Sequence, residues 1–276
     1  YSGSQNIDSL RSKKFEQVKN KAQESIKKLA INLLNLQAER LSEERPPYII
    51  DESLRQFETK FLKNFPFDMT LDQEKVYQEI LQDLESTKIM DRLVCGDVGV
   101  GKTEIAARAA CRVALSGYQV VLLCPTTILS YQHYLSFKER FTDLPLTIDY
   151  LNRFKTTKNQ KDLLEKTKDG SIDILITTTK FLGKKNIFKN LGLVIVDEEH
   201  KFGVQHKESI KKEYHLIDIL SLSATPIPRT LQLSLFNLKD LSIIHTKPKN
   251  RIPTEIFIQN EDLNLVKTLI LKEIAR

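Results

Sequence analysis

Apolar residues near the start of the chain recur at steps of three and four positions, with Lys and Glu between them. The positions are Phe15, Val18, Ala22, Ile26, Leu29, Leu33 and Leu36. This period predicts one long amphipathic helix from about Asp8 to Leu41. Packing along a neighbouring element and a connection to a preceding domain both explain such a helix. Pro46 and Pro47 end the pattern, because proline lacks a backbone N–H. We interpret residues 1–45 as a connector helix and residues 46–68 as a proline-containing linker.

Short apolar runs alternate with helical stretches from Arg92 onward. The runs predict strands at Arg92–Cys95, Gln119–Cys124, Leu146–Leu151, Ile172–Thr177, Leu191–Val196 and Ile217–Leu222. The stretches between them predict helices at Thr103–Ser116, Ile128–Phe141, Thr157–Lys168 and Val204–Glu213. Strands that are apolar on both faces and separated by helices indicate an α/β fold, with a parallel sheet covered on both faces. We predict that this lobe occupies residues 69–246.

The pattern changes again after about Lys247. A proline-flanked stretch, Ile252–Ile258, is expected to be extended, and Glu261–Ala275 is expected to form a helix. We interpret residues 247–276 as the start of a truncated second lobe.

One glycine-rich segment directly follows a predicted strand and opens a predicted helix. It reads Gly96-Asp97-Val98-Gly99-Val100-Gly101-Lys102-Thr103 and matches the phosphate-binding pattern G-x-x-x-x-G-K-S/T. Glycines let backbone N–H groups approach phosphate oxygens. Lys102 is expected to reach the β- and γ-phosphates, and the Thr103 hydroxyl is expected to bind Mg²⁺. A glycine-rich turn with a surface lysine is the alternative, which the full match and its setting disfavour.

Another apolar run ends in the polar residues Asp197, Glu198, Glu199 and His200. Its strand delivers Asp197 to the carboxyl edge of the sheet, where open α/β sheets bind ligands. We expect Asp197 to hold Mg²⁺ through water and Glu198 to orient and deprotonate the attacking water. Two acids after a strand are by themselves typical of a surface cap, but together with a phosphate loop they predict nucleotide hydrolysis. His200 is a candidate sensor of the γ-phosphate.

The last predicted strand is followed by Ser223, Ala224 and Thr225. Small hydroxyl residues there are able to hydrogen-bond His200 or Glu198, which would couple this segment to the nucleotide state. An ordinary strand-to-loop turn explains the same residues equally well.

Composition narrows the class of protein. The chain has 276 residues with 41% apolar and 28% charged residues, which excludes a disordered chain. Its three cysteines have no C-x-x-C spacing, which favours reduced thiols in a cytoplasmic protein over disulfides or a zinc site. The net charge of +6 fits a nucleic-acid partner, although a basic surface explains it as well. The chain begins at Tyr1 without a signal sequence, and we expect it to be a piece of a longer protein.

Taken in order, these segments resemble the first motor lobe of the superfamily 2 helicases and translocases, and within them the bacterial transcription-repair coupling factors. The resemblance runs from about Lys13 to the C-terminus. The residues that carry it are Met90–Gly99, Gly101–Glu104, Pro125–Thr127, Gln132–His133, Asn152–Phe154, Asp197–Val204, His206–Lys207 and Ser223–Thr230.

The resemblance implies a RecA-like lobe that binds ATP and Mg²⁺. It adds Glu104, Phe67 and Gln73 to the nucleotide site, with the Gln73 amide pairing with adenine. It places Thr126, Thr127, Arg153, Thr178 and Arg229 along a double-stranded DNA track. The parent protein would walk on DNA, displace stalled RNA polymerase and recruit excision-repair proteins. The second-lobe pattern Gln-x-x-Gly-Arg-x-Gly-Arg does not occur in the sequence, so this piece alone is expected to hydrolyse ATP poorly.

Two other functions stay open. The fork-rescuing branch-migration translocases share the phosphate loop but typically have Gln at the position of Glu199. A non-motor ATP switch would have little use for Glu198 as a water-activating group. Two segments depart from the coupling-factor pattern: Val100 stands where Tyr is usual, and Thr177–Lys180 replaces Gly-Thr-His-Lys.

Overall fold

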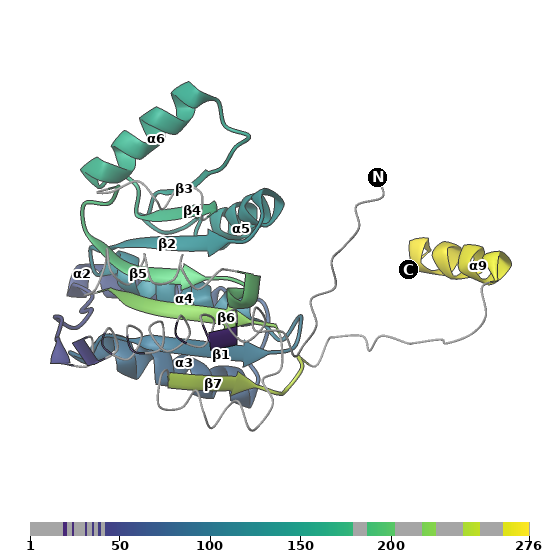
Figure 1. Ribbon diagram of the computed structural model, residues 1–276, viewed down its shortest axis with the longest axis horizontal. Coiled ribbons are helices and arrows are strands. Elements are labelled where there is room, and N and C mark those ends of the chain that lie inside the picture. Colours follow the sequence, from purple (N-terminus) through teal and green to yellow (C-terminus); the bar gives the residue numbers. More distant parts are fainter. Residues whose placement is uncertain are drawn as a thin grey trace.

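The computed structural model describes residues 42–178, 187–201, 217–224, 240–248 and 262–275, with single positions between 19 and 39 (Figure 1). Lys19, Asn20, Glu24, Ile31, Asn35, Ala38, Glu39 and Ser42 are helical, in agreement with the predicted long helix. The apolar positions that predicted this helix lie outside the described residues. So do the predicted helix Val204–Glu213 and the predicted extended stretch Ile252–Ile258.

Seven described strands form one parallel sheet, which confirms the predicted α/β class. Their order across the sheet is β3-β4-β2-β5-β6-β1-β7. The strands are β1 (Asp91–Gly96), β2 (Gln119–Cys124), β3 (Ile148–Leu151), β4 (Ile174–Thr178), β5 (Leu191–Val196), β6 (Asp218–Ser223) and β7 (Asp240–Ile244). From β1 the chain crosses the intervening β6 and β5 to reach β2, whereas from β6 it crosses β1 in the opposite direction to reach β7. The direction of the connections therefore reverses beside β1. Ligands bind at such switch points in open α/β sheets.

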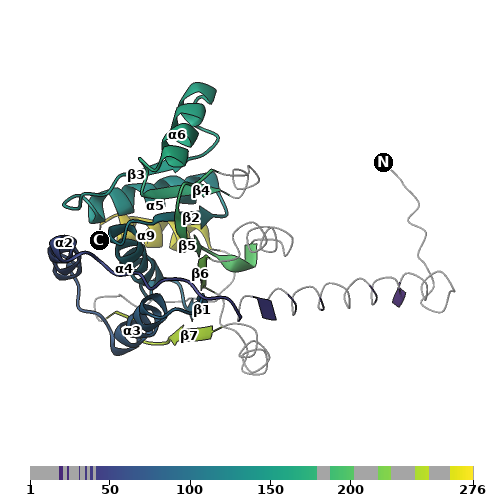
Figure 2. The ribbon, with the colours of Figure 1, turned by 90° about the vertical axis from the view of Figure 1, so that its left-hand side faces the viewer.

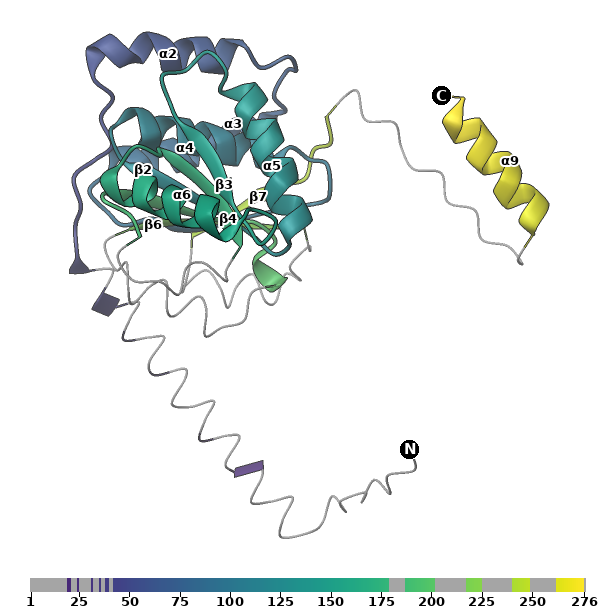
Figure 3. The same ribbon diagram turned by 90° about the horizontal axis from the view of Figure 1, so that it is seen from above.

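Side chains that alternate along each strand build two separate layers of core. On β2, Val120 and Leu122 join the main apolar cluster, whereas Val121 and Leu123 pack on the opposite face. The main cluster lies under α2 (Glu52–Lys63), α3 (Leu71–Glu85), α4 (Lys102–Leu115) and α5 (Thr127–Arg140), and Figure 3 shows α2 and α4 on one side of the strands. Helix α6 (Thr157–Asp169) covers the other face through Leu163. Helices therefore lie on both faces, as predicted.

Strand β7 was not predicted from the sequence. Its five residues include Asp240 and Ser242, and it lies at the edge of the sheet with β1 as its neighbour. An edge strand has one partner and a half-exposed face, so it lacks the continuous apolar run that marks a buried parallel strand.

The segment 46–68, predicted as a linker, is packed on the lobe. Tyr48, Ile50 and Phe61 are buried in the main cluster, and α2 begins after Asp51, whose side chain accepts a hydrogen bond from the N–H of Ser53. Prolines end one helix but do not prevent another from starting a few residues later. The apolar spacing of Leu54, Phe57 and Phe61 is the sequence signal that identifies this second helix.

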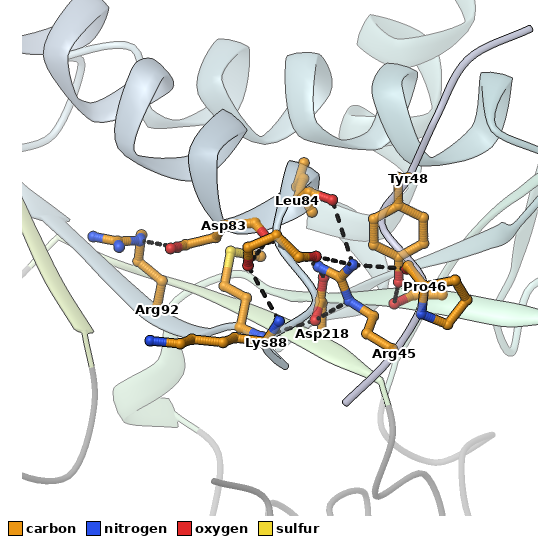
Figure 4. A network of polar contacts seen from close by, with 11 residues as sticks. Arg45, Pro46, Tyr48, Asp83, Leu84, Lys88, Arg92 and Asp218 are labelled. Carbon is orange, nitrogen blue, oxygen red and sulfur yellow. Dashed lines mark hydrogen bonds and ion pairs between the residues drawn. The ribbon is translucent and has the colours of Figure 1, made fainter. Parts of the chain in front are cut away.

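A buried ion pair fixes the end of the N-terminal region to the sheet (Figure 4). Arg45 donates to both carboxylate oxygens of Asp218 at 3.0 and 2.6 Å, and its guanidinium lies 4.2 Å from the centre of the Tyr48 ring. The backbone N–H of Met90 donates to the same carboxylate at 2.8 Å. Arg45 also donates to the backbone carbonyls of Pro46, Asp83, Leu84 and Ser86. Residues that follow the long helix are thereby tied to β6 and α3.

The last described element is α9 (Leu263–Ile274), which confirms the helix predicted at Glu261–Ala275. Asp262 caps it by accepting hydrogen bonds from the N–H groups of Asn264 and Leu265. None of its residues is buried, and Figure 2 shows it in yellow near the C-terminus.

Candidate nucleotide-binding site

The glycine-rich loop lies between β1 and α4, as the sequence predicts. Gly99 and Gly101 have φ values of 76° and 84°, which lie in the left-handed region that favours glycine. A Cβ on Gly96 would lie 2.7 Å from Cγ2 of Val100, and one on Gly101 would collide with the amide nitrogen of Gln73. The loop therefore needs glycine at these positions in order to wrap this closely. Helix α4 begins immediately afterwards at Lys102, so the positive end of its dipole faces the loop.

Lys102 folds back into the loop. Its Nζ donates hydrogen bonds to the carbonyls of Gly96 at 2.7 Å and Asp97 at 2.8 Å. Desolvation lowers the pKa of the Lys102 amine, and the nearby carboxylates of Glu198 and Asp197 act in the opposite direction. The amine thus lies inside the glycine-rich loop, with the two predicted catalytic carboxylates within electrostatic reach.

Asp197 directly follows β5, one strand removed from β1, because β6 lies between them. Its backbone N–H donates to the carbonyl of Leu123 at 2.9 Å. Glu198 has a φ of 53°, the one positive value among the described residues other than glycine. A left-handed glutamate costs roughly 1–3 kcal/mol, and such strain concentrates at functional sites. The structure therefore places Asp197 and Glu198 within electrostatic reach of Lys102, and it places Thr103 at the exposed first turn of α4.

Sequence reasoning gave no role to His133, which contacts the site. Its Nε2 lies 2.8 Å from Oδ2 of Asp197, and both side chains are 13% exposed. His133 belongs to α5, and 64 positions separate it from Asp197 in the sequence. A local pattern does not reveal a pair that far apart. The available signal is the helical spacing of Ser130, His133 and Phe137, which share the face turned to the sheet.

Gln73 is held by the protein on both sides of its amide. Its Nε2 donates to the carbonyl of Val100 at 2.7 Å, and its Oε1 accepts from the N–H of Thr70 at 2.7 Å in a capping box that starts α3. Only 5% of the residue is exposed. The side chain therefore fastens α3 to the phosphate loop. Each amide group keeps one further hydrogen-bonding position, which adenine pairing would have to use.

Phe67 lies on the loop before α3, 59% exposed, with its ring 5.6 Å from that of Phe65. The start of α3 also contacts the segment after β7, because Asp72 accepts hydrogen bonds from the N–H groups of His245 and Thr246 at 2.8 Å. Hydrogen bonds from these two N–H groups lower the pKa of the Asp72 carboxyl. The predicted adenine segment is thus anchored beside the loop and leaves the Phe67 ring accessible.

The carboxylate of Glu104 is paired within the protein, and its contact with nucleotide stays a prediction. The carboxylate accepts hydrogen bonds from Arg108 at 2.9 Å and from two nitrogens of Arg140 at 2.9 and 3.1 Å. Only 11% of the side chain is exposed. The charge is neutralised within the protein, and Glu104 joins α4 to α5 in the way that a packing residue does.

The predicted DNA residues gather at the carboxyl edge of neighbouring strands. Thr126 caps α5 after β2, Arg153 follows β3, and Thr178 ends β4. Cys124 pairs with Thr178 and Leu151 with Thr177, so these strands end side by side. Arg153 is exposed and lies over the Phe154 ring, while Thr127 and Thr178 are half-buried. Arg229 lies outside the described residues.

The predicted coupling segment begins beside the phosphate loop. Ser223 ends β6, is 5% exposed, and pairs in register with Cys95 of β1. Ala224 follows, half-buried. Thr225 and the side chain of His200 lie outside the described residues, so the predicted contacts between this segment and His200 stay predictions.

The fit of a magnesium ion follows from the donors present. Thr103 and Asp197 offer one hydroxyl and one carboxylate, and Mg²⁺ in phosphate sites is held by few protein oxygens, with phosphates and water completing its shell. No group of three His, Cys, Asp or Glu side chains in the described part of the chain forms a metal site by itself. In the same part, no helix is long and apolar enough to cross a membrane.

Residues 70–234 match the family model described as DEAD/DEAH box helicase. The chain belongs to the DEAD/DEAH box helicase family. The matched residues include the phosphate loop and the Asp197–Glu198 pair.

This helicase lobe also has named relatives. It is 44% identical over 98% of its length to a transcription-repair-coupling factor of Myxococcus xanthus and 42% identical to that of Staphylococcus aureus. It spans only 22% and 23% of those relatives. A structure of RecG bound to a three-way DNA junction superposes with a TM-score of 0.72 at 32% identity, covering 93% of this chain and 35% of that one. The DNA-bound helicase MrfA, at 15% identity and a TM-score of 0.55, covers 75% of this chain and 31% of its own and shares the fold.

Proposed function

We propose that the chain is the ATP-binding first motor lobe of an ATP-dependent double-stranded DNA translocase of the transcription-repair coupling type. The observation that carries this proposal is the position of Lys102, which is held inside the phosphate loop within electrostatic reach of the carboxylates of Asp197 and Glu198. A loop alone binds phosphate. The added carboxylates, one of them on a strained backbone, supply the means to hydrolyse a bound nucleoside triphosphate.

The residues divide the work as follows. Lys102 exchanges its two carbonyl partners for β- and γ-phosphate oxygens, while the N–H groups of the loop and of the start of α4 surround the phosphates. Thr103 and Asp197 would hold Mg²⁺, which supplies positive charge at the phosphate oxygens. Glu198 accepts a proton from water as the water oxygen bonds to the γ-phosphorus and the bond to the β-phosphate oxygen breaks.

The wider role rests on similarity. The coupling-factor relatives match nearly the whole chain, and the neighbour at 32% identity is bound to DNA. We therefore infer double-stranded DNA as the partner along Thr126, Thr127, Arg153 and Thr178. Displacement of stalled RNA polymerase and recruitment of excision-repair proteins in the cytoplasm would involve other parts of the parent protein. The RecG similarity supports a second candidate, a translocase that acts on branched DNA.

Substitution of Lys102 tests the proposal. Lys102→Ala removes the charged donor to the phosphates, and charge-assisted hydrogen bonds of this kind contribute roughly 1.5–3 kcal/mol each. We expect the affinity for a fluorescent ATP analogue with Mg²⁺ to fall by about 100-fold or more. Lys158→Ala, an exposed lysine on α6, is the matched control and should bind normally. Unchanged affinity in Lys102→Ala would refute the assignment of the site.

A further inference from the structure

Helix α5 connects two regions that the proposed function keeps separate. At one end, Thr126 caps the helix and belongs to the proposed DNA track. Two turns later, His133 contacts Asp197 of the proposed metal site at 2.8 Å. The two regions are therefore joined by a single rigid element.

The first turn of α5 is fastened to the loop that carries Arg153. The side chain of Asn152 donates to Ser130 Oγ at 3.3 Å, and Ser130 Oγ donates to the carbonyl of Thr127 at 2.8 Å. Asn152 also accepts a hydrogen bond from the N–H of Phe154 at 3.0 Å. Ser130 and Asn152 are fully buried. Since buried hydrogen bonds are costly to break, a shift of the Arg153 loop moves the start of α5 with it.

At the other end, the contact with Asp197 depends closely on position. The backbone of Asp197 is fixed by its N–H bond to Leu123, so His133 sets the orientation of the carboxylate. The contact uses one carboxylate oxygen and leaves the second for a water of the metal shell. A displacement of α5 by about 1 Å would stretch the 2.8 Å contact beyond hydrogen-bonding distance.

We propose that His133 is a positioning residue that holds Asp197 for Mg²⁺ and transmits the contact of DNA with the start of α5 to that carboxylate. The inference rests on the proposed function. His133 touches neither nucleotide nor DNA in this role. It acts through Asp197, as the outer hydrogen-bond partners of metal ligands do elsewhere.

The first experiment measures Mg²⁺ affinity. The chain is titrated with Mg²⁺ in the presence of a fluorescent ATP analogue, and analogue affinity is also measured in EDTA. Loss of an outer hydrogen-bond partner typically weakens metal binding by 10–100-fold, so we expect about 10-fold weaker Mg²⁺ binding in His133→Ala. Affinity in EDTA should not change, because the phosphate loop is intact. A merely structural role for His133 would lower both.

Further variants make the result interpretable. His133→Gln keeps an N–H donor and should restore most of the Mg²⁺ affinity. If His133→Ala does not fold, His133→Leu, which lacks a donor but fills more of the space, replaces it as the test variant with the same expected loss. Gln132→Ala, an exposed neighbour on α5, should behave as wild type. Asp197→Asn tests the metal site itself. If Asp197→Asn weakens Mg²⁺ binding and His133→Ala does not, only the inference fails. If neither has an effect, the metal assignment of the proposed function fails as well.

The second experiment measures transmission. Binding of a fluorescein-labelled DNA duplex is compared with and without the Mg²⁺-loaded, non-hydrolysable ATP analogue. Coupling between two ligands is reciprocal, and typical values correspond to 5–150-fold changes in affinity. We expect the nucleotide to change DNA affinity at least about fivefold in wild type and in Gln132→Ala, and about twofold or less in His133→Ala. Equal coupling in wild type and His133→Ala, or none in wild type, would overturn the transmission.

Discussion

The ion pair between Arg45 and Asp218 provides a sharp test of how the lobe is held together. The Arg45 side chain is 5% exposed and that of Asp218 is fully buried. Arg45→Ala leaves the Asp218 charge inside the protein without its guanidinium partner, while the N–H of Met90 still donates to the carboxylate. Removing one partner of a buried pair costs about 3–5 kcal/mol, because the remaining charge is desolvated and uncompensated.

The cost is measured by urea unfolding, followed by circular dichroism, or by thermal unfolding. For a lobe of this size, each kcal/mol shifts the midpoint of thermal unfolding by about 2–4 °C, so we expect a fall of roughly 6–20 °C. Arg55→Ala is the matched control. Arg55 pairs with Glu52 at 3.8 Å with 60% and 86% of the side chains exposed, and such a surface pair contributes about 0–1 kcal/mol.

A double variant separates the pair from its surroundings. Arg45→Met combined with Asp218→Asn removes both charges. The loss of stability of this double variant should be smaller than the sum of the losses of Arg45→Met alone and Asp218→Asn alone. If Arg45→Ala unfolds within about 1 kcal/mol of wild type, or if the two single losses simply add, the pair does not have the buried character described here.

Two further predictions concern the thiols and the DNA track. Cys95, Cys111 and Cys124 are buried, and burial raises the pKa of the Cys111 and Cys124 thiols well above the usual range. Ellman's reagent at pH 8 should therefore react slowly with the native chain. In denaturant it should react readily with all three thiols. Rapid native reaction of Cys111 or Cys124 would contradict their burial. DNA binding should be indifferent to sequence and should weaken steeply with salt, and Arg153→Gln should reduce the slope of log affinity against log salt by about 0.9, whereas Arg55→Gln should leave it unchanged. A preference for a three-way junction over a plain duplex would favour the branched-DNA candidate.

Some parts of the fold follow directly from local pattern. The bounds of β2 and β5 agree with the predicted Gln119–Cys124 and Leu191–Val196, because a strand buried on both faces is a continuous apolar run. The phosphate loop was equally predictable, since glycine at 99 and 101 is required by the backbone itself. In these cases the residues that determine the structure are neighbours in the sequence.

Other parts depend on partners that are distant in the sequence. Glu104 reads as a continuation of the phosphate loop, yet Arg140, 36 positions away, takes up its charge. Gln73 is predicted, by resemblance, to contact adenine. Its partner, the carbonyl of Val100, is set by how α3 packs against the loop. The contact of His133 with Asp197 is of the same kind, because it depends on the placement of a helix across a sheet.

Strand β6 shows why stability and catalysis are separable in this lobe. It begins at Asp218, the partner of Arg45, and ends at Ser223, in register with Cys95 just before the phosphate loop. Six residues of strand span about 20 Å. The Arg45–Asp218 pair therefore lies at the amino end of β6, and the nucleotide site lies near its carboxyl end. Sites that far apart with no shared partner affect one another little. Arg45→Ala should therefore lower the free energy of unfolding, while folded molecules bind the ATP analogue normally. Lys102→Ala should weaken binding of the ATP analogue and leave the free energy of unfolding nearly unchanged.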